Sequence, residues 1–166
     1  MRTLDRKPTA NSRIIFDPMM TQDKFDELED KLSQLMERSQ PRAAAEVSRL
    51  AELGDFSENT EYQMAKGKLR GMNNAILRLS NQIEQAIIIP ANLKKDTVQI
   101  GSNIVVESDD KQTTYQILGS SQTDPSKGII SHTSPIGSAL LGHKTGDVVD
   151  IQLVNKIVQY KIVRIF

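Results

Sequence analysis

Residues 62–86 read YQMAKGKLRGMNNAILRLSNQIEQA, and this stretch decides the fold. Its apolar residues recur in alternating steps of three and four: Tyr62, Ala65, Leu69, Met72, Ile76, Leu79, Ile83 and Ala86. Such spacing keeps apolar side chains on one narrow face of an α-helix, as in a coiled-coil strand. The stretch therefore predicts a long helix whose apolar face needs a partner.

A second heptad series precedes this helix and supplies the partner. Its positions are Phe25, Leu28, Leu32 and Leu35, then a slip through Ser39 and Ala43, then Val47 and Leu50. In an antiparallel hairpin the position numbers of facing residues add to a constant. They add to 112 near the fold-back (Leu50 with Tyr62, Val47 with Ala65, Ala43 with Leu69) and to 111 farther away (Leu35 with Ile76, Leu32 with Leu79, Leu28 with Ile83).

The two arms therefore fold back at residues 55 and 56, just after Gly54, which suits the left-handed residue that ends a helix. Each arm has about 30 residues, or roughly 45 to 50 Å of helix. Pro41 lies near the heptad slip, where we expect a kink or local unwinding of the first arm. Two core helices of a bundle are the alternative reading. The long unbroken pattern favours a projecting hairpin.

The predicted fold class is α+β, because short alternating segments follow the helices. We expect a flexible N-terminal tail over residues 1–20, a coiled-coil hairpin over 21–89 with its tip at 54–62, a linker over 90–96 and a small β-rich domain over 97–166. The strand candidates are Val98–Ile100, Ile104–Val106, Tyr115–Leu118, Ile129–Ile130, Val148–Val154 and Ile157–Ile165. A short helix from Ser134 to Leu141 and a turn at Lys144–Asp147 lie between them.

Composition excludes several function classes. The chain has no cysteine, so disulfides, thiolate catalysis and Cys-ligated zinc are excluded. Its 21 basic and 21 acidic residues leave no net charge for binding nucleic acid by bulk attraction. No apolar run reaches the roughly 20 residues of a membrane span, and the N-terminus lacks the apolar region of a secretory signal. We expect a cytoplasmic protein that does not bind membranes.

The hairpin tip carries the most informative polar residues, in the segment Gly54-Asp55-Phe56-Ser57-Glu58-Asn59-Thr60-Glu61-Tyr62. Asp55, Glu58 and Glu61 are spaced three apart, so their carboxylates can share one face of a helix start. A carboxylate pair can hold Mg²⁺ only weakly unless other groups complete the site. The plainer reading is helix capping, with acidic residues favoured by the helix dipole.

Basic residues follow the tip on the second arm: Lys66, Lys68, Arg70 and Arg78, with no acidic residue between Tyr62 and Ile83. The position numbers of Arg42 and Arg70 add to 112, which predicts that the two residues lie opposite each other on the two arms. These side chains can contact phosphates without reading sequence, or they can form an ordinary solvated helix face. The two histidines, His132 and His143, have no partners at metal-ligand or triad spacing, so we expect surface or structural roles for both.

The tip segment resembles the tip motif of the bacterial Gre (GreA/GreB) transcript-cleavage factors, and the resemblance extends through Ala65-Lys66. The second half agrees independently, in the segments 124–128 (DPSKG), 134–142 (SPIGSALLG) and Gly146-Asp147. The resemblance covers roughly residues 21–166, and the C-terminal half is more similar to the A-type members.

The resemblance implies a hairpin that enters the secondary channel of bacterial RNA polymerase, while a C-terminal domain similar to FK506-binding isomerases (FKBP-like) grips the channel rim. Asp55 and Glu58 match the tip carboxylates that help hold an Mg²⁺ ion shared with the polymerase, which then cleaves backtracked RNA. Asn59, Glu61 and Tyr62 would support the tip. Lys66 and Arg70 lie where the family has basic residues directed at the RNA. Arg42, which the facing sums place opposite Arg70, is the third basic residue that we expect to contact the RNA.

The resemblance also implies that the protein is no enzyme by itself and acts as a monomer, although exposed heptads can also pair between chains. Three alternatives stay open. The protein could be a channel-binding regulator that does not stimulate cleavage, against which the intact Asp55 and Glu58 argue. The C-terminal domain could be a prolyl isomerase, but it has few aromatic residues for an apolar pocket. The hairpin could also serve as a coiled-coil adaptor, using its flank and not its tip.

Overall fold

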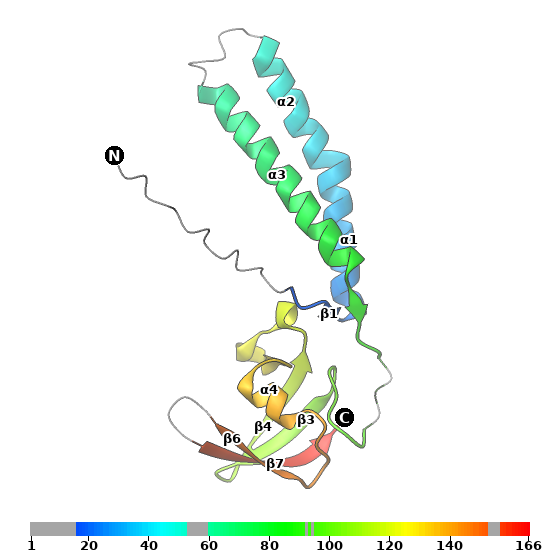
Figure 1. Ribbon diagram of the computed structural model, residues 1–166, viewed down its shortest axis with the longest axis vertical. Helices are drawn as coiled ribbons and strands as arrows, with labels where there is room; N and C mark the ends of the chain where they lie inside the picture. The colour runs from blue at the N-terminus through cyan, green and yellow to red at the C-terminus, as the bar shows by residue number, and fades with distance from the viewer. Residues whose placement is uncertain (1–15, 53–59, 92, 94, 153–156) are drawn as a thin grey trace, which may run out of the picture.

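The structure, a computed structural model, describes residues 16–52, 60–91, 93, 95–152 and 157–166. A long helical hairpin projects away from a small β-rich domain (Figure 1). The first arm consists of α1 (Gln22–Gln34), a π-helical turn (Leu35–Ser39) and α2 (Gln40–Glu52), and the second arm is α3 (Thr60–Glu84). This architecture confirms the predicted α+β fold.

The apolar faces of the two arms pack against each other as the heptads predict. Each member of both series is buried or half-buried, and Leu28, Ala43, Leu50 and Leu79 are the most deeply buried. Polar groups add a link at mid-length, where the Gln40 side-chain amide donates a hydrogen bond of 2.8 Å to the Asn73 side-chain oxygen. Removal of this apolar surface from water holds the arms together.

The π-helical turn accounts for the shift in register between the arms. The backbone N–H of Gln40 donates to the carbonyl of Leu35, five residues back instead of four. A π turn inserts one extra residue into a helix, so the sums of facing positions change from 111 to 112 across it. Pro41 follows directly, and the carbonyl with which its ring would clash, that of Glu37, lies inside the widened turn. The expected local unwinding near Pro41 is confirmed.

A two-stranded parallel sheet closes the base of the hairpin. β1 (Met19–Met20) pairs with β2 (Ile87–Ile88), and Met20 is completely buried against Leu28 and Leu79. The prediction of a flexible tail over residues 1–20 is therefore wrong for residues 16–20. A strand of two residues has no period to detect, and its partner lies almost 70 residues away. Residues 1–15 lie outside the described part of the chain.

The second arm is slightly shorter than the heptad series suggests. The series runs to Ala86, but α3 ends at Glu84 and the chain enters β2 at Ile87. The run Ile87-Ile88-Ile89 consists of β-branched residues, which favour extended backbone over helix. Beyond it, Pro90 and the other described residues of the expected linker 90–96 form no helix or strand.

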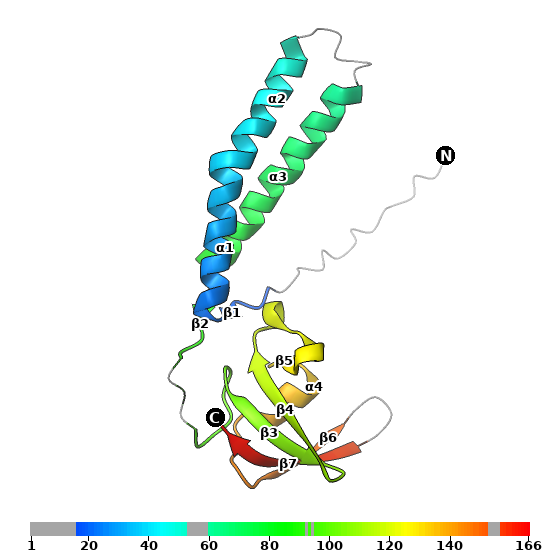
Figure 2. The same ribbon diagram turned by 180° about the vertical axis from the view of Figure 1, so that it is seen from behind.

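The C-terminal domain contains one five-stranded sheet with the order β5-β4-β3-β7-β6, in which only the β4–β5 pair is parallel. Helix α4 (Pro135–Leu140) covers one face of this sheet, in front of it in Figure 1 and behind it in Figure 2. The strands are β3 (Asn103–Ser108), β4 (Lys111–Leu118), β5 (Ile129–Ser131), β6 (Val148–Gln152) and β7 (Ile157–Ile165).

The core of this domain lies between the sheet and α4, and its fully buried members include Ile104, Ile117, Leu140 and Ile162. The strand expected at Val98–Ile100 is absent from the described secondary structure. Val98 is buried, and it exchanges backbone hydrogen bonds with Gly142 and His143 instead of joining the sheet. Gly101, with φ of +101°, turns the chain immediately afterwards. No helix within the described ranges has the length and apolar character needed to span a membrane.

Candidate functional site

The hairpin tip is the candidate site, and its carboxylates Asp55 and Glu58 and the amide Asn59 lie outside the described residues. The structure does describe the two helix ends that bracket them. The chain leaves α2 at Glu52 and enters α3 at Thr60, at the end of the hairpin farthest from the C-terminal domain (Figure 1). A partner of these carboxylates would therefore meet the protein at the end of the hairpin that is farthest from the C-terminal domain.

The first turns of α3 carry the remaining tip residues. Glu61 is exposed, whereas Tyr62 is half-buried at the last heptad position before the tip. The Lys66 ammonium lies 5.8 Å from the centre of the Tyr62 ring, within reach of a cation–π contact. The structure thus brings Tyr62 and Lys66 together one turn apart, as their spacing of four residues allows.

The first arm carries an ion pair near the end of α2, between Arg49 and Glu46. The Arg49 guanidinium donates to both carboxylate oxygens of Glu46, at 2.8 and 3.0 Å. This bond raises the pKa of Arg49 above its ordinary value, and the charge of Glu61 adds to the effect. Both partners of the pair are exposed, so solvent screens it and it contributes little to stability.

Farther from the tip, a groove of about 310 Å³ runs between α2 and α3. Arg42 from the first arm and Lys68 from the second arm line it, together with Glu46 and the apolar floor of Ala43, Ala65 and Met72. The pKa of Glu46 is lowered, chiefly by its hydrogen bond with Arg49 and to a smaller degree by the charge of Lys68. Arg42 and Lys68 thus line the same groove from opposite arms.

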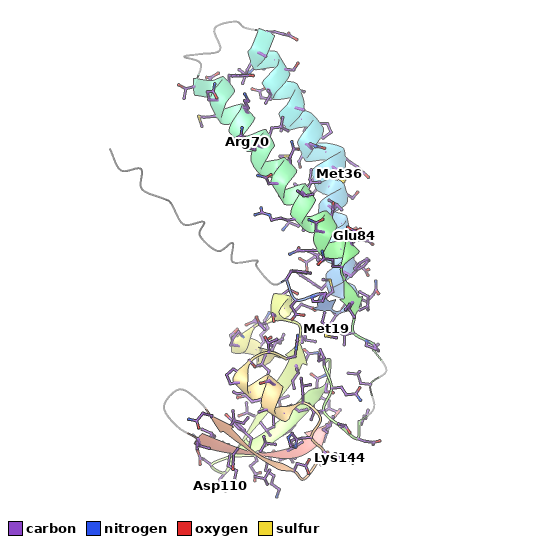
Figure 3. All side chains as sticks on the ribbon, viewed as in Figure 1. Met19, Met36, Arg70, Glu84, Asp110 and Lys144 are labelled. Carbon is purple, nitrogen blue, oxygen red and sulfur yellow. The ribbon has the colours of Figure 1, made fainter. Side chains whose placement is uncertain are left out.

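Arg70, which the facing sums placed opposite Arg42, does not line this groove. It is exposed, and it lies on α3 in the half nearer the tip (Figure 3). Lys68 is one of the basic residues that the sequence indicates on the second arm, but the resemblance assigns RNA contact to Lys66 and Arg70 instead. The structure places Lys68, and neither of those two, in the groove with Arg42.

Charge is unevenly distributed along the hairpin. α1, at the base, carries five carboxylates and two lysines, whereas α3 carries four cations and no acidic residue between Tyr62 and Ile83. Phosphate groups would be repelled at the base and attracted to the distal part of α3. The zero net charge of the chain conceals this separation.

The histidines have structural partners. His132 Nε2 lies 2.9 Å from a carboxylate oxygen of Asp17, and His143 Nδ1 lies 3.3 Å from one of Asp147. Within the described residues, no three His, Cys, Asp or Glu side chains gather as a metal site would require. The only oxygen pair proposed for Mg²⁺ is Asp55 with Glu58, at the tip.

Comparisons with known proteins agree for both halves of the chain. Residues 18–88 match the family described as "Transcription elongation factor, N-terminal", and residues 93–166 match "Transcription elongation factor, GreA/GreB, C-term". The breakpoint between the matches falls in the segment that joins β2 to the C-terminal domain.

Individual relatives match over nearly their full length. Transcription elongation factor GreA of Metamycoplasma arthritidis is 37% identical over 150 residues, covering 88% of this chain and 94% of the relative. The protein of the same name from Clostridioides difficile is 34% identical, covering 89% and 94%. Among solved structures, GreA factor homolog 1 protein of Thermus thermophilus aligns with a TM-score of 0.41 at 22% identity, covering 89% of this chain and 97% of that one.

Proposed function

Because the chain belongs to the GreA/GreB family of transcription elongation factors, we propose that it binds bacterial RNA polymerase, inserts its hairpin into the secondary channel and stimulates cleavage of backtracked nascent RNA. The observation that supports this proposal most strongly is the position of the tip. Glu52 and Thr60 bracket Asp55 and Glu58 at the distal end of a two-helix projection. A projection of about 45 to 50 Å can reach an active site that lies deep inside a partner.

Asp55 and Glu58 are the groups that we propose act in the polymerase active site. Their carboxylate oxygens are hard ligands that suit Mg²⁺, and two of them form an incomplete site that the polymerase would complete. When bound, the ion supplies activation of water and stabilisation of the leaving oxygen in phosphodiester hydrolysis. The factor is then no enzyme by itself, because it contributes ligands to chemistry that another protein performs.

The neighbouring side chains would hold the tip and the RNA in place. Tyr62 is half-buried between the two arms and can fix the start of α3, where Glu61 precedes it. Asn59, which lies outside the described residues, would support the tip as well. Lys66 and Arg70 are exposed on the same arm, and Arg42 lines the groove between the arms together with Lys68. Cations in these positions would attract phosphates near the RNA 3′ end without distinguishing bases.

The C-terminal domain would grip the rim of the channel, so that the hairpin points inward. The factor would act as a monomer in the cytoplasm, where its polymerase is found. The A-type character of the relatives supports a GreA-like cleavage pattern for this chain.

The test measures RNA release from a deliberately backtracked polymerase complex in Mg²⁺. The unmutated protein should stimulate RNA release. The double variant Asp55→Asn with Glu58→Gln should still bind polymerase, but its stimulation of the release rate should be about 100-fold weaker. A matched control is Asp26→Asn with Glu29→Gln. These two exposed carboxylates are also three apart, but they lie on α1 at the base.

Each outcome is decisive. Loss confined to the tip variant would support the proposal. Binding without any stimulation by the unmutated protein would indicate a regulator that does not stimulate cleavage. Failure to bind polymerase would favour the adaptor function, in which neutralising the tip changes nothing.

A further inference from the structure

The N-terminal segment that precedes the hairpin is bonded to the C-terminal domain through Asp17. One carboxylate oxygen of Asp17 accepts from the backbone N–H of Met19 at 3.1 Å, at the start of β1. The other accepts from the backbone N–H of Ser120 at 2.6 Å and lies 2.9 Å from His132 Nε2. An ionised carboxylate can only accept, so Nε2 carries the proton in this bond. One side chain thus joins the hairpin base to two points of the C-terminal domain.

The electrostatics of Asp17 agree with this geometry. Partial burial would by itself raise the pKa of Asp17, but hydrogen bonds from Ser120, Met19 and His132 outweigh it and hold the pKa below its ordinary value. The side chains of Asp17 and His132 are only 11% and 20% exposed. Charge-assisted hydrogen bonds shielded in this way are stronger than neutral ones on an open surface.

A second pair of bonds lies beside the first. The backbone N–H of Thr21 donates to the side-chain oxygen of Gln122 at 2.9 Å, and the Gln122 amide donates to the Thr21 hydroxyl at 2.8 Å. Thr21 also caps α1, because its hydroxyl accepts from the backbone N–H of Lys24. The first turn of the hairpin is therefore directly tied to the turn that follows β4.

Close backbone contact accompanies these bonds. A Cβ atom added to Gly119 would lie 1.9 Å from the carbonyl oxygen of Met19, closer than any side chain allows. Gly119 has an ordinary backbone conformation, with φ of −66°, so the contact itself requires glycine here. Figure 3 shows Met19 at the junction of the hairpin with the β-rich domain.

We propose that Asp17, Thr21, Gly119, Ser120, Gln122 and His132 form an interdomain clasp that fixes the direction of the hairpin relative to the C-terminal domain. The chain itself connects β2 to β3 by a segment without helix or strand in its described residues, which alone would leave this direction loosely defined. The clasp supplies a second attachment, through residues that directly precede and follow β1.

The length of the hairpin gives the clasp its importance. The tip lies about 50 Å from Thr21, so a rotation of about 10° at the base moves it by roughly 9 Å. Displacements far smaller than this disrupt the placement of reacting groups. Asp17 is thus a positioning residue for the tip, and this part of the inference rests on the proposed function.

The direction of the hairpin can be measured in the free protein by pulsed electron spin resonance. Because the chain has no cysteine, Leu77→Cys in α3 and Lys111→Cys in β4, both exposed, would give two unique spin-label sites. We expect one narrow distance distribution for the otherwise unmutated protein. Asp17→Ala should broaden it severalfold. Gly119→Ala should do the same from the other side of the contact, and Asp23→Ala, an exposed carboxylate on α1, should change nothing.

Helical circular dichroism at 222 nm should be the same in all variants, which separates a loosened clasp from unfolding. The clasp proposal is refuted if Asp17→Ala and Gly119→Ala both keep the narrow distribution. That result does not depend on polymerase, so it is distinct from any failure of the proposed function.

The cleavage assay then tests positioning. A loosened clasp should raise the factor concentration for half-maximal stimulation by about tenfold, because an ordered direction must be regained on binding. The maximal rate should stay within about twofold, since the polymerase channel would hold the bound hairpin. An unchanged half-maximal concentration for Asp17→Ala would overturn the positioning role.

Discussion

Leu79→Ala should destabilise the hairpin, whereas Leu77→Ala, two residues earlier in the same helix, should not. Leu79 is 8% exposed and packs with Met20 and Leu28, while Leu77 is 61% exposed. Truncation of a buried leucine costs about 2 to 5 kcal/mol. The half-buried residues around Leu79 can relax into the space, so we expect about 2 to 3 kcal/mol, against about 0.5 kcal/mol or less at Leu77.

Urea unfolding followed at 222 nm measures this difference, because nearly all of the described α-helix belongs to the hairpin. The change in helix propensity is the same in both variants and cancels in the comparison. A clearly lower urea midpoint for Leu79→Ala, but not for Leu77→Ala, would support the packing of Leu79 against Met20 and Leu28. Equal midpoints would refute the assignment of Leu79 to a buried cluster.

Three further predictions concern the register between the two arms, the interdomain clasp and the basic residues of α3. Deletion of Glu37 from the π-helical turn should change the free energy of unfolding by less than about 1 kcal/mol, because it removes the extra residue of that turn. Deletion of Ser48 should instead rotate Leu50 away from the apolar contact between the arms and cost about 1.5 to 3 kcal/mol. Urea unfolding measures both changes. Because folding lowers the pKa of Asp17, this carboxylate contributes its full stabilisation above pH 3.8, its ordinary pKa, and loses it as the pH falls through the lowered pKa. Acid unfolding of Asp17→Ala should lack this part of the pH dependence. Lys66→Gln with Arg70→Gln should weaken cleavage stimulation and reduce its dependence on salt concentration, and an unchanged salt dependence would contradict contact with phosphates.

The heptads predicted the hairpin in detail because its contacts are periodic and both arms carry the pattern. The sequence predicted a kink or local unwinding near Pro41, and the π turn at Leu35–Ser39 explains why the facing sums change from 111 to 112 there. Strands β3, β6 and β7 were found for a similar reason, since alternating burial in a half-exposed sheet leaves a period of two in the sequence. Burial does not alternate in β4 and β5, which were found from their apolar segments alone.

The misses have a common cause, which is that they depend on contacts distant in sequence. Met19 and Met20 form a strand only because Ile87 and Ile88 lie beside them. Asp17 lies over 100 residues from Ser120 and His132, and nothing in a single sequence links them. Gly119 looks like any turn glycine until the carbonyl of Met19 is seen against it. The role of the tip carboxylates rested on the resemblance, because their spacing alone also fits a helix cap.

If Asp55 is a metal ligand inside the polymerase, then replacing its carboxylate should change which metal ion supports cleavage, and this change tests its role most directly. Asp55→Cys would place a single thiolate at the tip of a chain that has no other cysteine. Thiolates favour soft ions over Mg²⁺. We predict that Asp55→Cys loses cleavage stimulation in Mg²⁺ alone and regains part of it when a trace of Cd²⁺ is added, whereas Asp55→Ala stays inactive in both. Equal responses of the two variants to Cd²⁺, or full activity of Asp55→Cys in Mg²⁺ alone, would contradict a direct role of this side chain at the metal.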